Sequence, residues 1–275
     1  MGKAVLIMFV AMSMIPAGDT AAKLLMTTHG VTPVFVGWSR FLIGALVVLP
    51  FVPGVTWALF GDWRIWMRAL LLSVGITSIQ LALRAEPIAD VFAAFFIGPI
   101  FSYVLSVIFL RERVTPLRST LMVLGFLGVL LVVRPGLGGS SGLIFAVIAG
   151  LCYGAFLTMS RWLSNIAPPV ALVFTQLAIS AAFLAPFALN TLPVLTASVV
   201  GLTLLSGMFS MAGNLLLLFA YRIAPATQMA PLVYFQLIAA TILGWTVFSD
   251  LPDIYTWIGL LLVIGSGIAS AFVRR

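Results

Sequence analysis

The chain has 275 residues, of which 63% are hydrophobic and only 8% are charged, and its formal net charge is +7. A soluble domain carries about 25% charged residues because its surface must face water, so this composition excludes a water-soluble globular protein. With a mean hydropathy of +1.23, most of the surface is expected to face lipid, and the sequence predicts an integral membrane protein.

Ten apolar runs are long enough to cross a bilayer as helices, which requires roughly 20 residues each. In chain order they cover residues 4–28, 34–53, 67–84, 88–110, 117–135, 142–164, 169–190, 196–221, 226–248 and 255–273. Transmembrane strands would alternate apolar and polar side chains, whereas stretches such as LMVLGFLGVLLVV are continuously apolar. The sequence therefore predicts one all-α domain over residues 1–275, with ten transmembrane helices.

The first predicted span contains two charges, Asp19 and Lys23, in the stretch AGDTAAKLLM. These charges, and the lack of a clear small-residue cleavage site, argue against a cleaved signal peptide. The i, i+4 spacing places both side chains on one helix face, and Arg40 lies in the second span, after a short loop. We expect the three side chains to form one cluster of net charge +1.

Two interpretations of this cluster stay open, because an ionisable group inside a bilayer faces either a partner or a cavity. In the structural interpretation, Asp19 neutralises Lys23 or Arg40 and holds the first two helices together. In the functional one, the cluster borders the substrate path and its surplus positive charge meets an anionic group of the solute. Asp19 would then be the carboxylate that takes up a proton during transport.

Neutral polar side chains within the spans extend this candidate path. Amides such as Gln176 need partners inside a bilayer, and either interhelical hydrogen bonds or a polar cavity would supply them. Three tyrosines lie within spans, and Trp38 is close to Arg40 in sequence. The candidate substrate-path or ion-path residues are Asp19, Lys23, Arg40, Trp38, Gln80, Tyr103, Tyr153, Asn214, Tyr234 and Gln236.

The distribution of lysine and arginine predicts the orientation, because short cytoplasmic loops carry an excess of both. The N-terminus is placed inside. The inner loops and termini then hold Lys3, Arg64, Arg68, Arg111, Arg113, Arg118, Arg161, Arg222, Arg274 and Arg275, and the outer loops hold only Arg84 and Arg134. Both termini are therefore expected in the cytoplasm. The net positive charge follows from this topology and does not indicate nucleic-acid binding.

An internal repeat relates the two halves of the chain at an offset of 138 residues (222 − 84 = 138). The related pairs are Arg84 and Arg222, Pro87 and Pro225, Glu112 and Asp250, and Lys23 and Arg161. Because each half holds five predicted spans, an odd number, the second half would enter the membrane from the opposite side. The sequence predicts two inverted five-helix repeats, residues 1–138 and 139–275, a plan common in secondary transporters.

These features together resemble the drug/metabolite transporter superfamily, in its ten-helix EamA branch. The residues that carry the resemblance are Asp19 and Lys23, Arg40 in WSRFLIGAL, Pro87, Pro99 in FFIGPIFSYVLSVIFLRERVTPL, and the helix after Glu112. The Asp-x-x-x-Lys pattern is similar to that of predicted riboflavin and S-adenosylmethionine carriers. Asp250 departs from the family pattern, in which glutamate is frequent. The resemblance implies ten helices around a central cavity that opens alternately to each side.

Motifs of enzymes and ATP-driven pumps are absent from the sequence. Cys152 is the one cysteine and His29 the one histidine, so no thiolate metal site is possible, and no phosphate-binding loop or hydrolase motif occurs. We expect no enzymatic activity, no metal and no cofactor. The energy for transport would come from an ion gradient, from exchange or from the gradient of the solute.

The sequence therefore predicts a secondary transporter in the cytoplasmic (inner) membrane. It would move a small organic metabolite, such as an amino acid or a vitamin-like or nucleoside-like compound, in either direction by alternating access. Its partners would be this solute, the lipid bilayer and either a proton or an exchanged solute. The alternatives are a broad-specificity drug exporter and an ion channel, although a channel would require rings of charges or carbonyls in a symmetric assembly.

Overall fold

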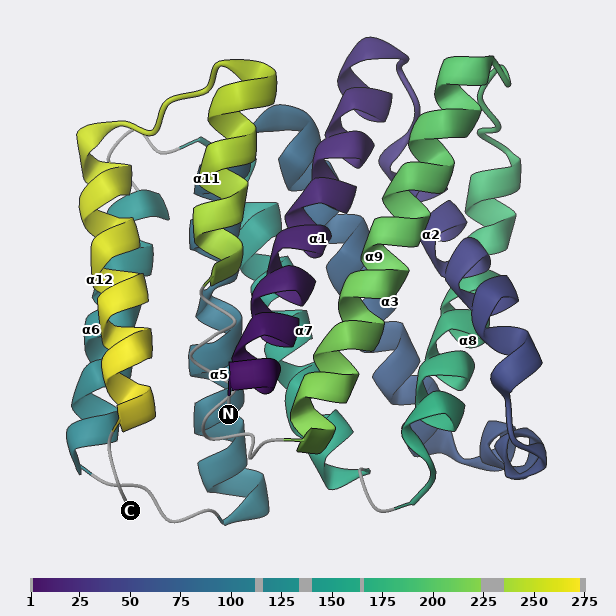
Figure 1. Ribbon diagram of the computed structural model, residues 1–275, viewed down its shortest axis with the longest axis horizontal. Coiled ribbons are helices and arrows are strands. Elements are labelled where there is room, and N and C mark those ends of the chain that lie inside the picture. Colours follow the sequence, from purple (N-terminus) through teal and green to yellow (C-terminus); the bar gives the residue numbers. More distant parts are fainter. Residues whose placement is uncertain (1, 112–115, 134–139, 164–165, 224–234, 273–275) are drawn as a thin grey trace.

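The computed structural model describes residues 2–111, 116–133, 140–163, 166–223 and 235–272, and every regular element in these ranges is a helix (Figure 1). The α-helices are α1 (Gly2–Thr28), α2 (Pro33–Val48), α3 (Trp63–Ala85), α4 (Ile88–Phe95), α5 (Ile97–Leu110), α6 (Pro116–Val133), α7 (Leu143–Trp162), α8 (Pro169–Leu189), α9 (Ala197–Ile223), α11 (Phe235–Phe248) and α12 (Ile254–Phe272). Two 3₁₀ helices, η1 (Leu49–Phe51) and η2 (Gly54–Gly61), connect α2 to α3. The all-α prediction is confirmed.

Seven helical segments in these ranges are long and apolar enough to cross a membrane. They are Leu6–Thr28, Pro33–Phe51, Trp63–Ala85, Ile88–Phe109, Leu143–Trp162, Pro169–Leu189 and Ala197–Leu217, and the shorter apolar segments are Ser119–Leu131, Phe235–Phe248 and Ile254–Ser266. Large apolar side chains such as Phe51 and Val194 are exposed on the outside, as expected where lipid is the solvent. The protein is thus a multi-pass membrane protein, and the count of ten spans stays a prediction.

Local signals in the sequence set the two turns that position the first three helices. Thr32 caps α2 by accepting a hydrogen bond from the Phe35 amide at 3.3 Å, and Pro33 occupies the first helical position, both of which favour helix initiation. Gly30 has φ +65°, a conformation that glycine adopts without steric cost. Asp62 caps α3 through the Arg64 amide. The tight turn between α1 and α2 brings Asp19 and Arg40 to face each other.

Pro99 divides the predicted span 88–110 into α4 and α5. A proline ring clashes with the carbonyl four residues earlier, here that of Phe95, and α4 ends at that residue. An added Cβ at Gly150 in α7 would lie 2.5 Å from the Phe95 oxygen, so only a glycine allows this close approach. The helix is interrupted at Phe96, three residues before Pro99, and the α4–α5 junction packs directly against α7.

Helices from the two halves of the chain pack against each other throughout the bundle (Figure 1). Three helices of the first half each contact helices of the second half: α1 packs on α9 and α11, α2 on α8 and α9, and α3 on α7 and α8. In addition, α5 packs on α7, and α6 on α12. The largest buried apolar cluster gathers near the C-terminal ends of α1 and α3, with Leu25, Leu83, Ile88 and Leu143 among its members. This cluster closes the end of the bundle that is predicted to face outward.

Candidate functional site

A buried ion pair joins α1 to α2 in the interior of the bundle. Arg40 Nη1 donates to Asp19 Oδ1, and the two side chains are each only 4% exposed. Gln80 Nε2 on α3 donates to the same Asp19 oxygen at 3.3 Å. Ionisable groups at membrane depth require such partners, so three helices converge on one carboxylate.

Lys23 has different partners, at the C-terminal end of α1. Its Nζ donates to the Glu86 carbonyl oxygen at 2.8 Å, lies 3.4 Å from Asp250 Oδ2 and sits 4.8 Å from the centroid of the Phe248 ring. Glu86 is the C-cap of α3, where carbonyls without intrahelical partners attract a cation. The expected single cluster is therefore split: Asp19 pairs with Arg40, while Lys23, one turn further along α1, bridges the connections after α3 and α11.

A cavity of about 250 Å³ lies beside the Asp19–Arg40 pair. Helices α1, α2, α3, α4, α7, α8, α9 and α11 contribute side chains to its wall, so both halves of the chain form it. The lining is mainly apolar and aromatic, and its polar members are Asp19, Arg40, Arg68, Tyr153, Ser160, Gln176, Ser210, Asn214 and Gln236. A concave apolar site with a few convergent polar groups is the usual form of a small-molecule site.

Five of the predicted path residues line this cavity: Asp19, Arg40, Tyr153, Asn214 and Gln236. Tyr153 lies between aromatic neighbours, with its ring centroid 5.0 Å from that of Phe95 and 5.8 Å from that of Phe156. The Asn214 amide donates to the Ser210 carbonyl within α9.

The other predicted path residues are placed elsewhere. Gln80 does not line the cavity but donates a hydrogen bond to Asp19. Trp38 packs against Phe35 and the apolar core. The Tyr103 hydroxyl shares a hydrogen bond with Ser119 on α6 at 3.0 Å, away from the cavity, because depth along a helix does not determine which face it occupies. Tyr234 lies outside the described residues.

Arg68 is a cavity residue that the sequence analysis missed. The count of basic residues assigned it to a cytoplasmic loop, whereas it lies one turn inside α3 and is 5% exposed. The sequence signal that could have identified it is its place in WRIWMRALLL, where an apolar residue already precedes it and an unbroken apolar run follows.

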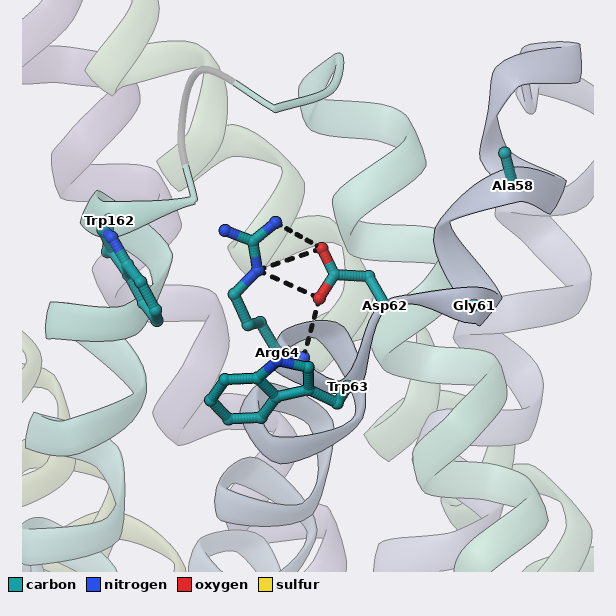
Figure 2. A pocket seen from close by; sticks show the side chains of 6 residues that line it. All are labelled: Ala58, Gly61, Asp62, Trp63, Arg64 and Trp162. Atoms are coloured by element: carbon teal, nitrogen blue, oxygen red, sulfur yellow. Dashed lines mark hydrogen bonds and ion pairs between the residues drawn. The ribbon is translucent and has the colours of Figure 1, made fainter.

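A second depression is shallow and lies on the surface beside η2 and the end of α7 (Figure 2). Arg64 Nε donates to both Asp62 oxygens at 3.0 Å, and its guanidinium lies 5.5 Å from the Trp162 ring centroid. The side-chain and backbone hydrogen bonds from Arg64 hold the pKa of Asp62 below its usual range. The Asp62 carboxylate caps the start of α3, so helix capping accounts for the polar groups in this depression.

Known proteins similar to this chain are transporters. Matching proteins include a riboflavin transporter of Brucella anthropi, 26% identical over 95% of both chains. A second is an S-adenosylmethionine uptake transporter of Rickettsia bellii, 25% identical over 83% of this chain and 80% of that protein. A third is the pseudopaline exporter CntI of Pseudomonas aeruginosa, 27% identical over 86% and 85% of the two chains.

The fold is also found in a solved crystal structure, with a TM-score of 0.65 and 19% identity over 98% of this chain and 96% of that one. The model of the EamA-like transporter family matches this sequence twice, over residues 2–134 and again over residues 140–271. Because the two matches cover nearly the whole chain, the protein belongs to the EamA-like transporter family.

Proposed function

We propose that this protein is a secondary carrier that moves a small organic metabolite across the cytoplasmic membrane by alternating access. The observation that carries the proposal is the cavity beside the Asp19–Arg40 pair, which both halves of the chain line in the interior of the bundle. Its volume of about 250 Å³ is slightly below the usual range for ligand sites of roughly 300–1,000 Å³. A compact solute fits it better than a large drug.

Inverted repeats would supply the two alternative states of such a carrier, and the helix boundaries support them. Adding 138 to the last residue of α5 (110) gives 248, which is the last residue of α11. The same offset relates α1 to α7, α2 to α8, α3 to α9 and α6 to α12, within a few residues at each end. The two matches of the family model agree with this division.

The contacts between helices are also consistent with two related halves. Under the offset, the α1–α9 contact becomes the α7–α3 contact, α1–α11 becomes α7–α5, and α2–α9 becomes α8–α3. The α2–α8 and α6–α12 contacts map onto themselves. Each observed pairing in this set has its counterpart, as expected when two similar halves are related by a twofold axis.

Lys23 would form part of the seal on the outer side. It connects α1 to the end of α3 and to the connection between α11 and α12, through Glu86 and Asp250. Ser140, just before α7, donates a hydrogen bond to the Glu86 carboxylate. This contact links the start of α7 to the C-terminal end of α3. With both termini in the cytoplasm, these contacts and the apolar cluster close the outside, and the cavity belongs to an inward-facing state.

The relatives include proteins named for uptake and for export. An alternating-access cycle is reversible, so both directions are compatible with one architecture and the prevailing gradient determines the net flow. Asp19 and Arg40 contribute a dipole to the cavity wall, while the apolar and aromatic lining accommodates the body of the solute.

A screen followed by a transport assay tests the proposal. Purified protein is first screened by thermal shift against metabolites, beginning with riboflavin and S-adenosylmethionine. A stabilising compound is then used in proteoliposomes, where preloaded unlabelled solute should drive saturable entry of labelled solute. Flux that rises linearly with concentration and shows no counterflow would indicate a channel and would contradict the carrier proposal.

A further inference from the structure

The charges on the cavity wall are not balanced. Among the described residues that line it, the charged side chains are Asp19, Arg40 and Arg68, which gives a net charge of +1 (two arginines and one aspartate). Arg40 and Asp19 neutralise each other. In the part of the chain that the structure describes, Arg68 forms no ion pair with a carboxylate, although it is 5% exposed.

Neutral contacts hold the Arg68 side chain at the junction of three helices. Its Nε donates to Ser160 Oγ on α7 at 2.8 Å, and its Nη1 donates to the Leu172 carbonyl on α8 at 3.0 Å. The guanidinium carbon lies 4.7 Å from the centroid of the Phe156 ring. Ser160 in turn donates to the Phe156 carbonyl at 2.7 Å, so its hydroxyl is oriented to accept from arginine.

This arrangement leaves donors available. A guanidinium has five N–H groups in a planar fork, and the two hydrogen bonds above use one on Nε and one on Nη1. An uncompensated buried charge is costly, and the remaining fork geometry matches a carboxylate or phosphate. Among the described residues, the one carboxylate on the cavity wall, Asp19, is already paired with Arg40, so the Arg68 guanidinium keeps free donors that face no available anion.

Packing alone does not require this arginine. Under the 138-residue offset, the crossing of α3 and α7 at Arg68 corresponds to the crossing of α9 and α1 at Ser206 (68 + 138 = 206). There Ser206 Oγ donates to the Gly18 carbonyl at 2.8 Å, and the two helices pack closely. A serine thus suffices at the equivalent crossing, whereas α3 places a cation on the cavity wall.

We propose that Arg68 is the anion-binding residue of the cavity and receives a carboxylate or phosphate group of the transported solute. Ser160 and Phe156 position its guanidinium, and the aromatic wall contacts the rest of the solute. The inference rests on the proposed function, because it takes this cavity to be the solute site. It adds that the solutes are small organic anions, or zwitterions whose anionic end lies at Arg68.

Matched pairs of compounds that differ in one anionic group test this inference. The pairs are nicotinate and nicotinamide, tryptophan and tryptophanamide, and riboflavin 5′-phosphate and riboflavin. Affinities are measured by thermal shift in detergent for the parent protein, Arg68→Met and the control Arg64→Met, which removes a surface arginine outside the cavity. Binding in detergent does not require transport, so this inference and the carrier proposal fail separately.

At least one acid should bind the parent protein more tightly than its partner that lacks the anionic group. Since a hydrogen bond to a charged group contributes about 1.5–3 kcal/mol, Arg68→Met should weaken binding of that acid on the order of ten- to a hundredfold. Nicotinamide and riboflavin, which are neutral, should bind both proteins equally, tryptophanamide should not bind Arg68→Met more weakly than the parent, and Arg64→Met should behave as the parent. An acid preference that survives Arg68→Met, or no preference in any pair, would overturn the inference.

A replacement variant and a lipid control complete the test of Arg68. If Arg68→Met does not fold, Arg68→Lys replaces it: this variant keeps the charge and loses the fork, so weaker acid binding supports the inference and unchanged acid binding overturns it. The thermal shifts are also repeated with phosphatidylglycerol. If this lipid alone gives an Arg68-dependent stabilisation and the acids do not, Arg68 binds a headgroup and its role in solute binding is refuted.

Discussion

Replacing Arg40 with alanine tests the buried ion pair most severely. The side chains of Arg40 and Asp19 are each 4% exposed, so solvent screens their interaction little. Removing one partner of a buried pair leaves an uncompensated charge and typically costs about 3–5 kcal/mol. In Arg40→Ala, Asp19 would retain the Gln80 amide at 3.3 Å, which is too weak to replace a guanidinium.

The assay is thermal unfolding of the purified protein in detergent. At about 2–4 °C per kcal/mol for a chain of this size, Arg40→Ala should lower the melting temperature on the order of 10 °C. The double variant Asp19→Asn with Arg40→Gln removes both charges and allows an amide–amide hydrogen bond, so it should recover at least half of the loss. This non-additivity is the expected signature of directly coupled residues.

Arg64→Ala is the matched control for this experiment. It also breaks an arginine–aspartate pair, but at the surface, where the side chains are 33% and 20% exposed, and its melting temperature should stay close to that of the parent. A small effect of Arg40→Ala, or a double variant no more stable than the single one, would refute the account of the pair.

Two further predictions concern helix packing and pH. Gly154→Ala should destabilise the protein strongly, because the added Cβ would lie 2.4 Å from the Gly98 carbonyl oxygen, whereas Gly201→Ala, with nothing within 4 Å, should be neutral or stabilising by up to about 1 kcal/mol. Thermal unfolding compares the two, and equal effects would contradict the close approach of α5 and α7. Asp62→Asn should lower the melting temperature at pH 7. The side-chain and backbone hydrogen bonds from Arg64 hold the folded pKa of Asp62 below its usual range, and the backbone bond is kept in Arg64→Ala but loses its charged acceptor in Asp62→Asn. This stabilisation is present above the unfolded pKa of about 3.9 and is lost as pH falls through the folded pKa. A pH series should show the parent and variant converging in acid, and a gap that is constant with pH would refute this role.

The apolar runs predicted the helices well because chain length and continuous hydrophobicity are local properties. The break between α4 and α5 also has a local cause, since the Pro99 ring acts on a carbonyl only four residues away. The last residues of α5 and α11, 110 and 248, are separated by the same 138 residues as the pairs noted in the sequence.

The site was predictable only where a short connection brought rare charges together, whereas the i, i+4 spacing of Asp19 and Lys23 did not predict their separate partners. Asp19 and Arg40 were identified because charges in apolar spans are rare and a short loop joins their helices. The partner of Lys23 was not predicted, because Asp250 is far away in sequence, although the repeat had already singled it out as an acid at the end of a span. Arg68 was assigned to a loop because counting charges cannot detect that α7 and α8 bury it.

Counterflow through a cavity-blocking variant tests the central claim that the solute passes through this cavity. Leu157 on α7 lines the cavity, and Phe145 on the same helix is 40% exposed on its outer surface. With a solute found by the thermal-shift screen, Leu157→Trp should lose counterflow in proteoliposomes, while Phe145→Trp should retain the rate of the parent protein. A folded Leu157→Trp that exchanges solute as fast as the parent would contradict the account.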